Sequence, residues 1–249
     1  MSALVATESD DRPRPGAILG ACLLGFLVGE VTATALVLGA LHGSDFPGGL
    51  SALSRASAPP WWSNVLGLVG LWIGFAGAIY YATTSGRLPA MAHQWRPRAS
   101  DALFVLLGVG CQVVVTLAYY PFHFRTLNRP VHHLFGAAHG VTFALVALLT
   151  TVAAPIVEEW FFRGVVFRAL HEALDRVWSR GAVAGAVLLS AILFALAHGE
   201  PLQFIGLAFV GVVLAVVVRK TRRLLPSVIT HVSFNAVALA AVLAQRSGH

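Results

Sequence analysis

Long apolar runs, separated by short polar stretches that contain arginine, proline and glycine, make up most of the chain. An apolar run of about 20 residues is long enough to cross the hydrocarbon core of a bilayer as one α-helix. The pattern therefore predicts an all-α, polytopic transmembrane bundle of seven or eight helices. The apolar runs cover residues 16–41, 61–81, 101–120, 134–154, 182–198, 202–218 and 224–244.

The composition indicates a membrane protein and argues against nucleic acid as a partner. Hydrophobic residues make up 57% of the chain and charged residues 11%, whereas a soluble domain has about 25% charged residues. The net charge of +6 comes from arginines scattered through the loops, which is typical of membrane-flanking charge. We therefore expect a multi-pass integral membrane protein whose surroundings are the lipid bilayer, with no nucleic acid among its partners. The oligomeric state stays open.

The loops and the N-terminal segment indicate how the chain is oriented. Residues 1–15 are polar and predict a disordered cytoplasmic tail, which leaves 16–249 as a single transmembrane helical domain. Basic loops favour the cytoplasmic side, and 219–223 is the clearest of them. Seven crossings would place four basic segments on that side: Arg12 with Arg14, the loop 87–98, Arg176 with Arg180, and 219–223. A helix break at Pro155 would create an eighth crossing and place the last two of these segments outside. The arginine-rich composition points to the cell membrane of a prokaryote.

Two adjacent glutamates and an arginine follow Pro155 inside an apolar stretch. A charged side chain at the bilayer centre costs roughly 2.5–3.5 kcal/mol on insertion scales, so it usually faces a protein interior or a wet cavity. On a helix, Glu159 and Arg163 are four residues apart and can pair. Glu158 is rotated by about 100° from Glu159. This spacing predicts that Glu159 and Arg163 support the local structure, while Glu158 handles a proton or a ligand.

Two further polar sets interrupt the apolar sequence. His198 follows Phe194 by one helical turn, and Asn235 follows His231 by the same spacing. If the helices that carry Glu158 and His198 form a hairpin, the two residues lie within roughly 5 Å of the same level. A glutamate beside a histidine can deprotonate water, and a histidine with an asparagine can donate hydrogen bonds to an oxyanion. We therefore expect hydrolysis of an acyl bond, most naturally a peptide bond.

Other interpretations of the same polar residues remain open. Glu158, His198 and His231 also form a His₂Glu set, a known ligand combination for catalytic Zn²⁺, so the cofactor is one divalent metal or none. A buried polar network that only holds helices together would instead fit a non-proteolytic protein. A transporter using Glu30 and Glu158 as a proton relay predicts an internal repeat, and the sequence contains none. Glu30 by itself is either a functional carboxylate or a packing contact.

The motifs E-E-x-x-x-R, F-x-x-x-H and H-x-x-x-N, in this order across a polytopic chain, resemble the CPBP family. Its members include type II CAAX prenyl endopeptidases and bacterial abortive-infection and bacteriocin-immunity proteins. The resemblance covers about residues 150–240 and implies an intramembrane endopeptidase with its active site in a cavity of the bundle. The matching residues are Glu158, Glu159, Arg163, Phe194, His198, His231 and Asn235.

The resemblance also implies a role for each matching residue. Glu158 and His198 would activate water, and His231 with Asn235 would stabilise the oxyanion. Glu159, Arg163 and Phe194 would support the site. A metalloendopeptidase and a metal-free glutamate peptidase both fit the residues. The implied substrate is a membrane-associated peptide or protein, with a prenylated one as a candidate; the alternative is a non-proteolytic immunity or scaffold protein of the same fold.

Overall fold

The computed structural model describes residues 14–56, 58–85, 94–122, 133–135 and 137–247. Every regular element in this part of the chain is helical. Within the described residues, six helices are long and apolar enough to cross a membrane, and the shorter apolar helix Ala182–Ala197 accompanies them. The predicted polytopic helical bundle is therefore confirmed. Residues 1–13 of the predicted tail lie outside the described residues.

The α-helices follow one another as α1 (Pro15–His42), α2 (Gly49–Arg55), α3 (Trp61–Thr84), α4 (Leu103–Tyr119), α6 (Gly140–Leu148), α7 (Ala154–Glu159), α8 (Phe167–Asp175), α9 (Ala182–Ala197), α10 (Phe204–Thr221) and α11 (Leu225–Ser247). Short 3-10 helices, η2 (Ala99–Ala102) and η3 (Tyr120–Phe122), flank α4. Two π-helical segments, η4 (Leu149–Ala153) and η5 (Trp160–Val166), join α6 to α7 and α7 to α8.

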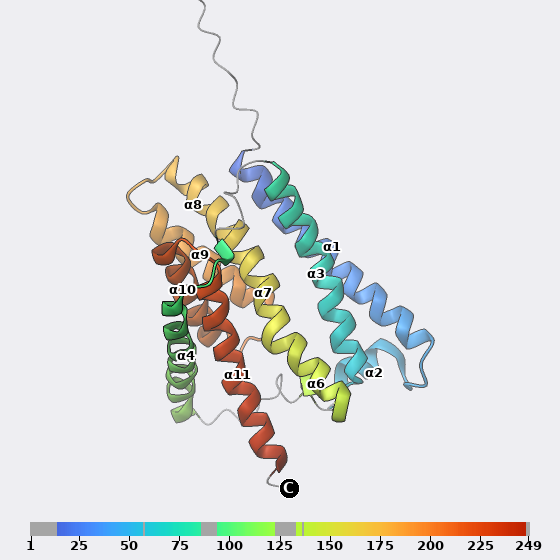
Figure 1. The fold of residues 1–249 in the computed structure, drawn as a ribbon. Helices are drawn as coiled ribbons and strands as arrows, with labels where there is room; N and C mark the ends of the chain where they lie inside the picture. Colours follow the sequence, from blue (N-terminus) through green and yellow to red (C-terminus); the bar gives the residue numbers. More distant parts are fainter. Residues whose placement is uncertain (1–13, 57, 86–93, 123–132, 136, 248–249) are drawn as a thin grey trace, which may run out of the picture.

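The path from α6 to α8 forms one continuous rod through the bundle (Figure 1). It runs over Gly140–Asp175 without a break. The helix therefore continues through Pro155, and the break that would have separated two crossings at this residue is not observed. A proline ring clashes with the carbonyl four residues earlier in an α-helix. The wider π-helical turn of η4, directly before α7, accommodates that ring.

Helices α1 and α3 lie side by side at one edge of the bundle (Figure 1). Their backbones approach closely through glycine, because a Cβ atom on Gly74 would lie only 1.9 Å from the carbonyl oxygen of Gly25. Small residues at such contacts are how membrane helices pack without a hydrophobic driving force. Phe75 of α3 then stacks on Phe161 with 3.9 Å between ring centroids, which joins the pair to the central rod.

Helix α11 lies between α4 and the central rod (Figure 1). On the α4 side, a Cβ on Gly108 would lie 2.2 Å from the backbone oxygen of Thr230, so only glycine permits this approach. On the other side α11 contacts η4 and α7. The last helix is therefore held against the segment that carries the two glutamates.

The basic connection between α10 and α11 is a buried joint. Arg223 is 2% exposed and forms a two-pronged ion pair with Asp101, with Nη1–Oδ1 and Nη2–Oδ2 distances of 2.8 and 2.6 Å. Its Nη2 also donates to the carbonyl of Arg96. The hydrogen bonds to Asp101 raise the pKa of the Arg223 guanidinium above its ordinary value. This joint fixes where α11 begins, and hence the depth of the polar residues along it.

Candidate active site

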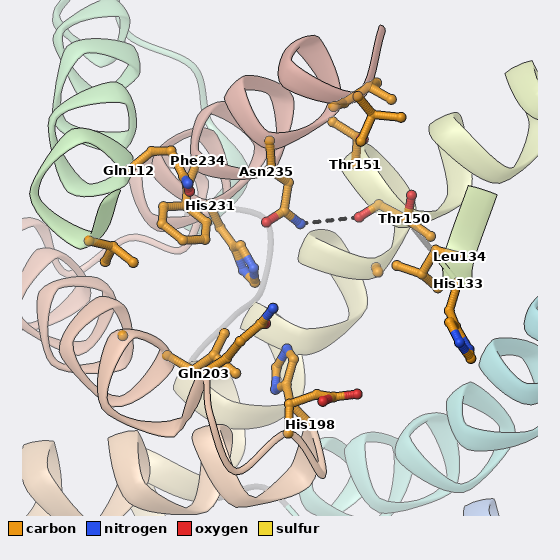
Figure 2. A pocket seen from close by; sticks show the side chains of 18 of the residues that line it. Gln112, His133, Leu134, Thr150, Thr151, His198, Gln203, His231, Phe234 and Asn235 are labelled. Atoms are coloured by element: carbon orange, nitrogen blue, oxygen red, sulfur yellow. Dashed lines mark hydrogen bonds between the residues drawn. The ribbon is translucent and has the colours of Figure 1, made fainter. Parts of the chain in front are cut away.

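A cavity of about 1310 Å³ opens between α3, α4, the central rod, α10 and α11. All four predicted catalytic residues line it: Glu158, His198, His231 and Asn235. Figure 2 shows the imidazole rings of His198 and His231 directed into the same space. Helix packing therefore brings together side chains that are up to 77 residues apart in the chain, from Glu158 to Asn235.

Glu159 lies beside this cavity, fully buried, and accepts three hydrogen bonds. Nη1 of Arg163 donates to it at 3.0 Å, which is the pair expected from their spacing. The Ser227 hydroxyl donates to Oε2, and Nδ1 of His231 donates to Oε1 at 3.1 Å. Arg163, also fully buried, uses Nη2 for the Gly211 carbonyl at 3.2 Å. The carboxylate and guanidinium are thus compensated inside the apolar bundle.

The two glutamates face different nitrogens of the His231 ring. A carboxylate only accepts hydrogen bonds, so Nδ1, which faces Glu159, carries a hydrogen. Nε2 lies 3.9 Å from Oε2 of Glu158, whose side chain is 15% exposed. Glu159 therefore fixes the orientation of the ring, and Glu158 shares the cavity with its second nitrogen.

The Phe194 ring contacts the rings of both histidines. Its ring is fully buried and its centroid lies 4.6 Å from that of His198 and 5.5 Å from that of His231. The guanidinium carbon of Arg163 lies 4.3 Å from the same centroid. Nδ1 of His198 also donates to the Phe194 carbonyl oxygen at 2.8 Å, which leaves Nε2 as the free nitrogen of the neutral ring.

The C-terminal part of the chain, which carries the polar residues of the cavity, is similar to a known protein family. Residues 134–237 match the family model described as type II CAAX prenyl endopeptidase Rce1-like. The match supports kinship of this region with the CAAX protease family. All three motifs of the predicted resemblance lie inside the matched residues, so the predicted kinship is confirmed. No curated protein and no solved structure matches the chain.

The CAAX protease region does not assemble the predicted metal ligands. Among the described residues, no group of three or more His, Cys, Asp or Glu side chains is placed to hold a metal ion. Nε2 of His231 and Oε2 of Glu158 are 3.9 Å apart, while Nδ1 of His198 is bound to a backbone carbonyl. The set Glu158, His198 and His231 therefore lines one cavity without forming a ligand cluster, and we derive no step through a metal.

The cavity of the CAAX protease region has a polar end, lined by Glu158, His198, His231 and Asn235, and a long apolar part. From the polar end it continues along α11 past Phe234, Leu239 and Val242 to Gln245. Leu68, Leu71 and Phe75 of α3 line the facing wall. Residues 231 to 245 span about 21 Å at the helical rise of 1.5 Å per residue. Such a shape admits an extended apolar group beside the polar residues.

The sequence did not indicate two residues near the polar end, and it left the role of Glu30 open. Gln203, in the turn before α10, extends between His198 and His231 (Figure 2). Thr150 accepts a hydrogen bond from Asn235 through its backbone carbonyl, 3.1 Å from Nδ2. Neither has a sequence signal, because a glutamine in a turn and a backbone carbonyl are both commonplace. Glu30 is exposed on α1 and is not among the residues that line the cavity.

Proposed function

We propose that the protein is an intramembrane endopeptidase that hydrolyses a peptide bond in a membrane-associated peptide or protein, with a prenylated substrate as one candidate. One observation carries the proposal: Glu158 of α7, His198 at the end of α9, and His231 and Asn235 of α11 line one cavity. Polar side chains at membrane depth are costly, so their convergence favours a functional site. The CAAX protease match over the same residues supports peptide hydrolysis.

In this proposal Glu158 and His198 together remove a proton from a water molecule. The hydrogen bond from Nδ1 of His198 to the Phe194 carbonyl leaves Nε2 free to accept that proton. The water oxygen then bonds to the carbonyl carbon of the peptide, and the carbonyl π electrons move to its oxygen. When the tetrahedral intermediate collapses, the C–N bond breaks and the leaving amine takes the proton from the same pair.

His231 and Asn235 stabilise the negative oxygen of that intermediate. They are four residues apart on α11, so they share one helix face. Glu159 holds Nδ1 of His231, so Nε2 is the ring nitrogen that would donate a proton to the oxyanion.

The first test is cleavage by the purified wild-type protein in detergent or vesicles. The substrates are fluorogenic peptides with a membrane anchor, each made with and without a C-terminal prenyl group. We expect cleavage of at least one anchored peptide, and we expect it to persist in a strong zinc chelator because the ligand set is not assembled. Loss of cleavage with the chelator, together with stoichiometric zinc, would establish a metalloendopeptidase instead. No cleavage of any peptide would favour the non-proteolytic immunity or scaffold protein.

We also propose that the N-terminus and the basic loops lie in the cytoplasm of a prokaryotic cell. The connection between α8 and α9 carries Arg176 and Arg180, and that between α10 and α11 carries Arg222 and Arg223. Basic loops of this length favour the cytoplasmic side. With seven crossings, a phosphatase fused to the C-terminus should be active outside the cell, and a fluorescent protein fused there should be dark. The reverse result would contradict this orientation.

A further inference from the structure

We propose that Pro155 is a positioning residue for the Asn235 amide. It withholds the backbone N–H that would otherwise occupy the Thr150 carbonyl, and so leaves this carbonyl to hold Asn235. The catalytic part of this proposal rests on the function proposed above. The structural part, a dependence of the Asn235 contact on Pro155, stands without it.

The hydrogen-bond register of η4 leaves one backbone carbonyl without a donor from its own helix. The N–H of Ala154 donates to the carbonyl of Leu149, five residues earlier. In this register the donor for the next carbonyl, that of Thr150, is the backbone nitrogen of residue 155. That residue is proline, which has no N–H. A backbone carbonyl inside the bundle is therefore left open for a partner from another helix, and an unpaired one would be costly.

Asn235 of α11 supplies that partner. Its Nδ2 donates to the Thr150 oxygen at 3.1 Å, and Figure 2 shows this bond across the top of the cavity. A carbonyl oxygen only accepts, so the NH₂ side of the amide must face Thr150. The bond therefore fixes the position of the Asn235 amide and determines that its nitrogen, not its oxygen, faces Thr150. It also ties α11 to the rod close to Glu158, because Pro155 precedes Glu158 by three residues.

The consequence for catalysis is preorganisation. An amide NH₂ group has two hydrogens, and the bond to Thr150 uses one of them. The second remains for the oxyanion, beside Nε2 of His231 one turn earlier on α11. An oxyanion donor is most effective when it is held in place before the reaction, because no reorganisation is then needed. Pro155 thus acts on the oxyanion through Asn235 without touching the substrate.

Pro155→Ala tests the proposal because it restores the missing N–H at residue 155. That N–H can take the Thr150 carbonyl and release Asn235. With the peptide that the wild type cleaves fastest, we expect kcat to fall about 10-fold and KM to change little, since the rest of the cavity is intact. Asn235→Ala should lower kcat by about 10²–10³. Adding Pro155→Ala to Asn235→Ala should cost little more. An unchanged kcat in Pro155→Ala, or independent effects in the double variant, would overturn the catalytic part.

Thermal unfolding in detergent tests the structural part without any substrate. Asn235→Ala should lower Tm in the wild-type background and by less than about half as much in the Pro155→Ala background, since residues sharing one partner are not additive. Ser227→Ala, which removes a donor to Glu159, is the matched control and should lower Tm equally in both backgrounds. Equal effects of Asn235→Ala in both backgrounds would refute the dependence on Pro155.

A second variant covers the case in which Pro155→Ala does not fold. Asn235→Asp keeps the size of the side chain but places acceptor oxygens against the Thr150 carbonyl. It should lower Tm at neutral pH and regain part of the loss at low pH, where a protonated acid can donate again. A Tm equal to that of the wild type at neutral pH would show that the bond to Thr150 does not hold Asn235.

Discussion

Glu158→Gln is expected to abolish detectable peptide cleavage, with kcat lowered by about 10²–10⁴-fold, because general acid–base groups contribute on that scale. The glutamine keeps the size of the side chain but cannot take a proton from water. Glu158 lines the cavity with a side chain that is 15% exposed, whereas Glu159 is fully buried among three donors. We therefore expect Tm to stay within about 2 °C of the wild type, since the lost contact is a partly exposed one.

Glu172→Gln is the matched control. Glu172 pairs with Arg176 on the exposed part of α8, with Nη2–Oε1 at 3.3 Å and both side chains at least 40% exposed. Exposed pairs of this kind contribute about 0–1 kcal/mol, so both kcat and Tm should be nearly unchanged. Cleavage by Glu158→Gln within about twofold of the wild-type rate, against an expected general-base effect of at least 10²-fold, would remove Glu158 from the proposed chemistry.

The spans of the bundle could be predicted from the sequence because the bilayer sets their length. The first predicted span, 16–41, and the helix Pro15–His42 differ by one residue at each end. The continuation of the helix through Pro155 could not be predicted from the sequence. A proline inside a helical pattern normally ends or kinks a helix, and nothing local indicates that a π-helical turn will accommodate the ring. Hydrogen-bond register of that kind depends on the partner helix as well as on the sequence.

The contacts within one helix could also be predicted, whereas those between helices could not. The spacing of Glu159 and Arg163 fixes their pairing, since residues four apart share a helix face. The same rule places His231 and Asn235 on one face of α11, but it does not say what that face meets. In the structure His231 contacts Glu159 and Asn235 contacts Thr150. These partners depend on the height of α11 against the central rod, which the buried joint at the start of α11 sets.

Arg163→Met is expected to cause the largest loss of stability. It leaves the fully buried Glu159 carboxylate without its cation and the Gly211 carbonyl without its donor. Breaking a buried ion pair by removing one partner costs about 3–5 kcal/mol. The measurement is thermal or denaturant unfolding of the purified protein in detergent. Arg176→Met, which breaks the exposed pair with Glu172, is the matched control and should have a small effect.

The double variant Glu159→Gln with Arg163→Met separates an unpaired charge from lost packing. If the loss in Arg163→Met comes from the stranded carboxylate, neutralising Glu159 should recover a large part of it, because contacting residues are not additive. If the loss comes from the guanidinium stacked on Phe194, the double variant should be no more stable than Arg163→Met. Recovery would not extend to cleavage, because Glu159 also orients His231. A double variant that is stable but inactive would therefore assign both a structural and an orienting role to Glu159, whereas full recovery of cleavage would contradict the orienting role.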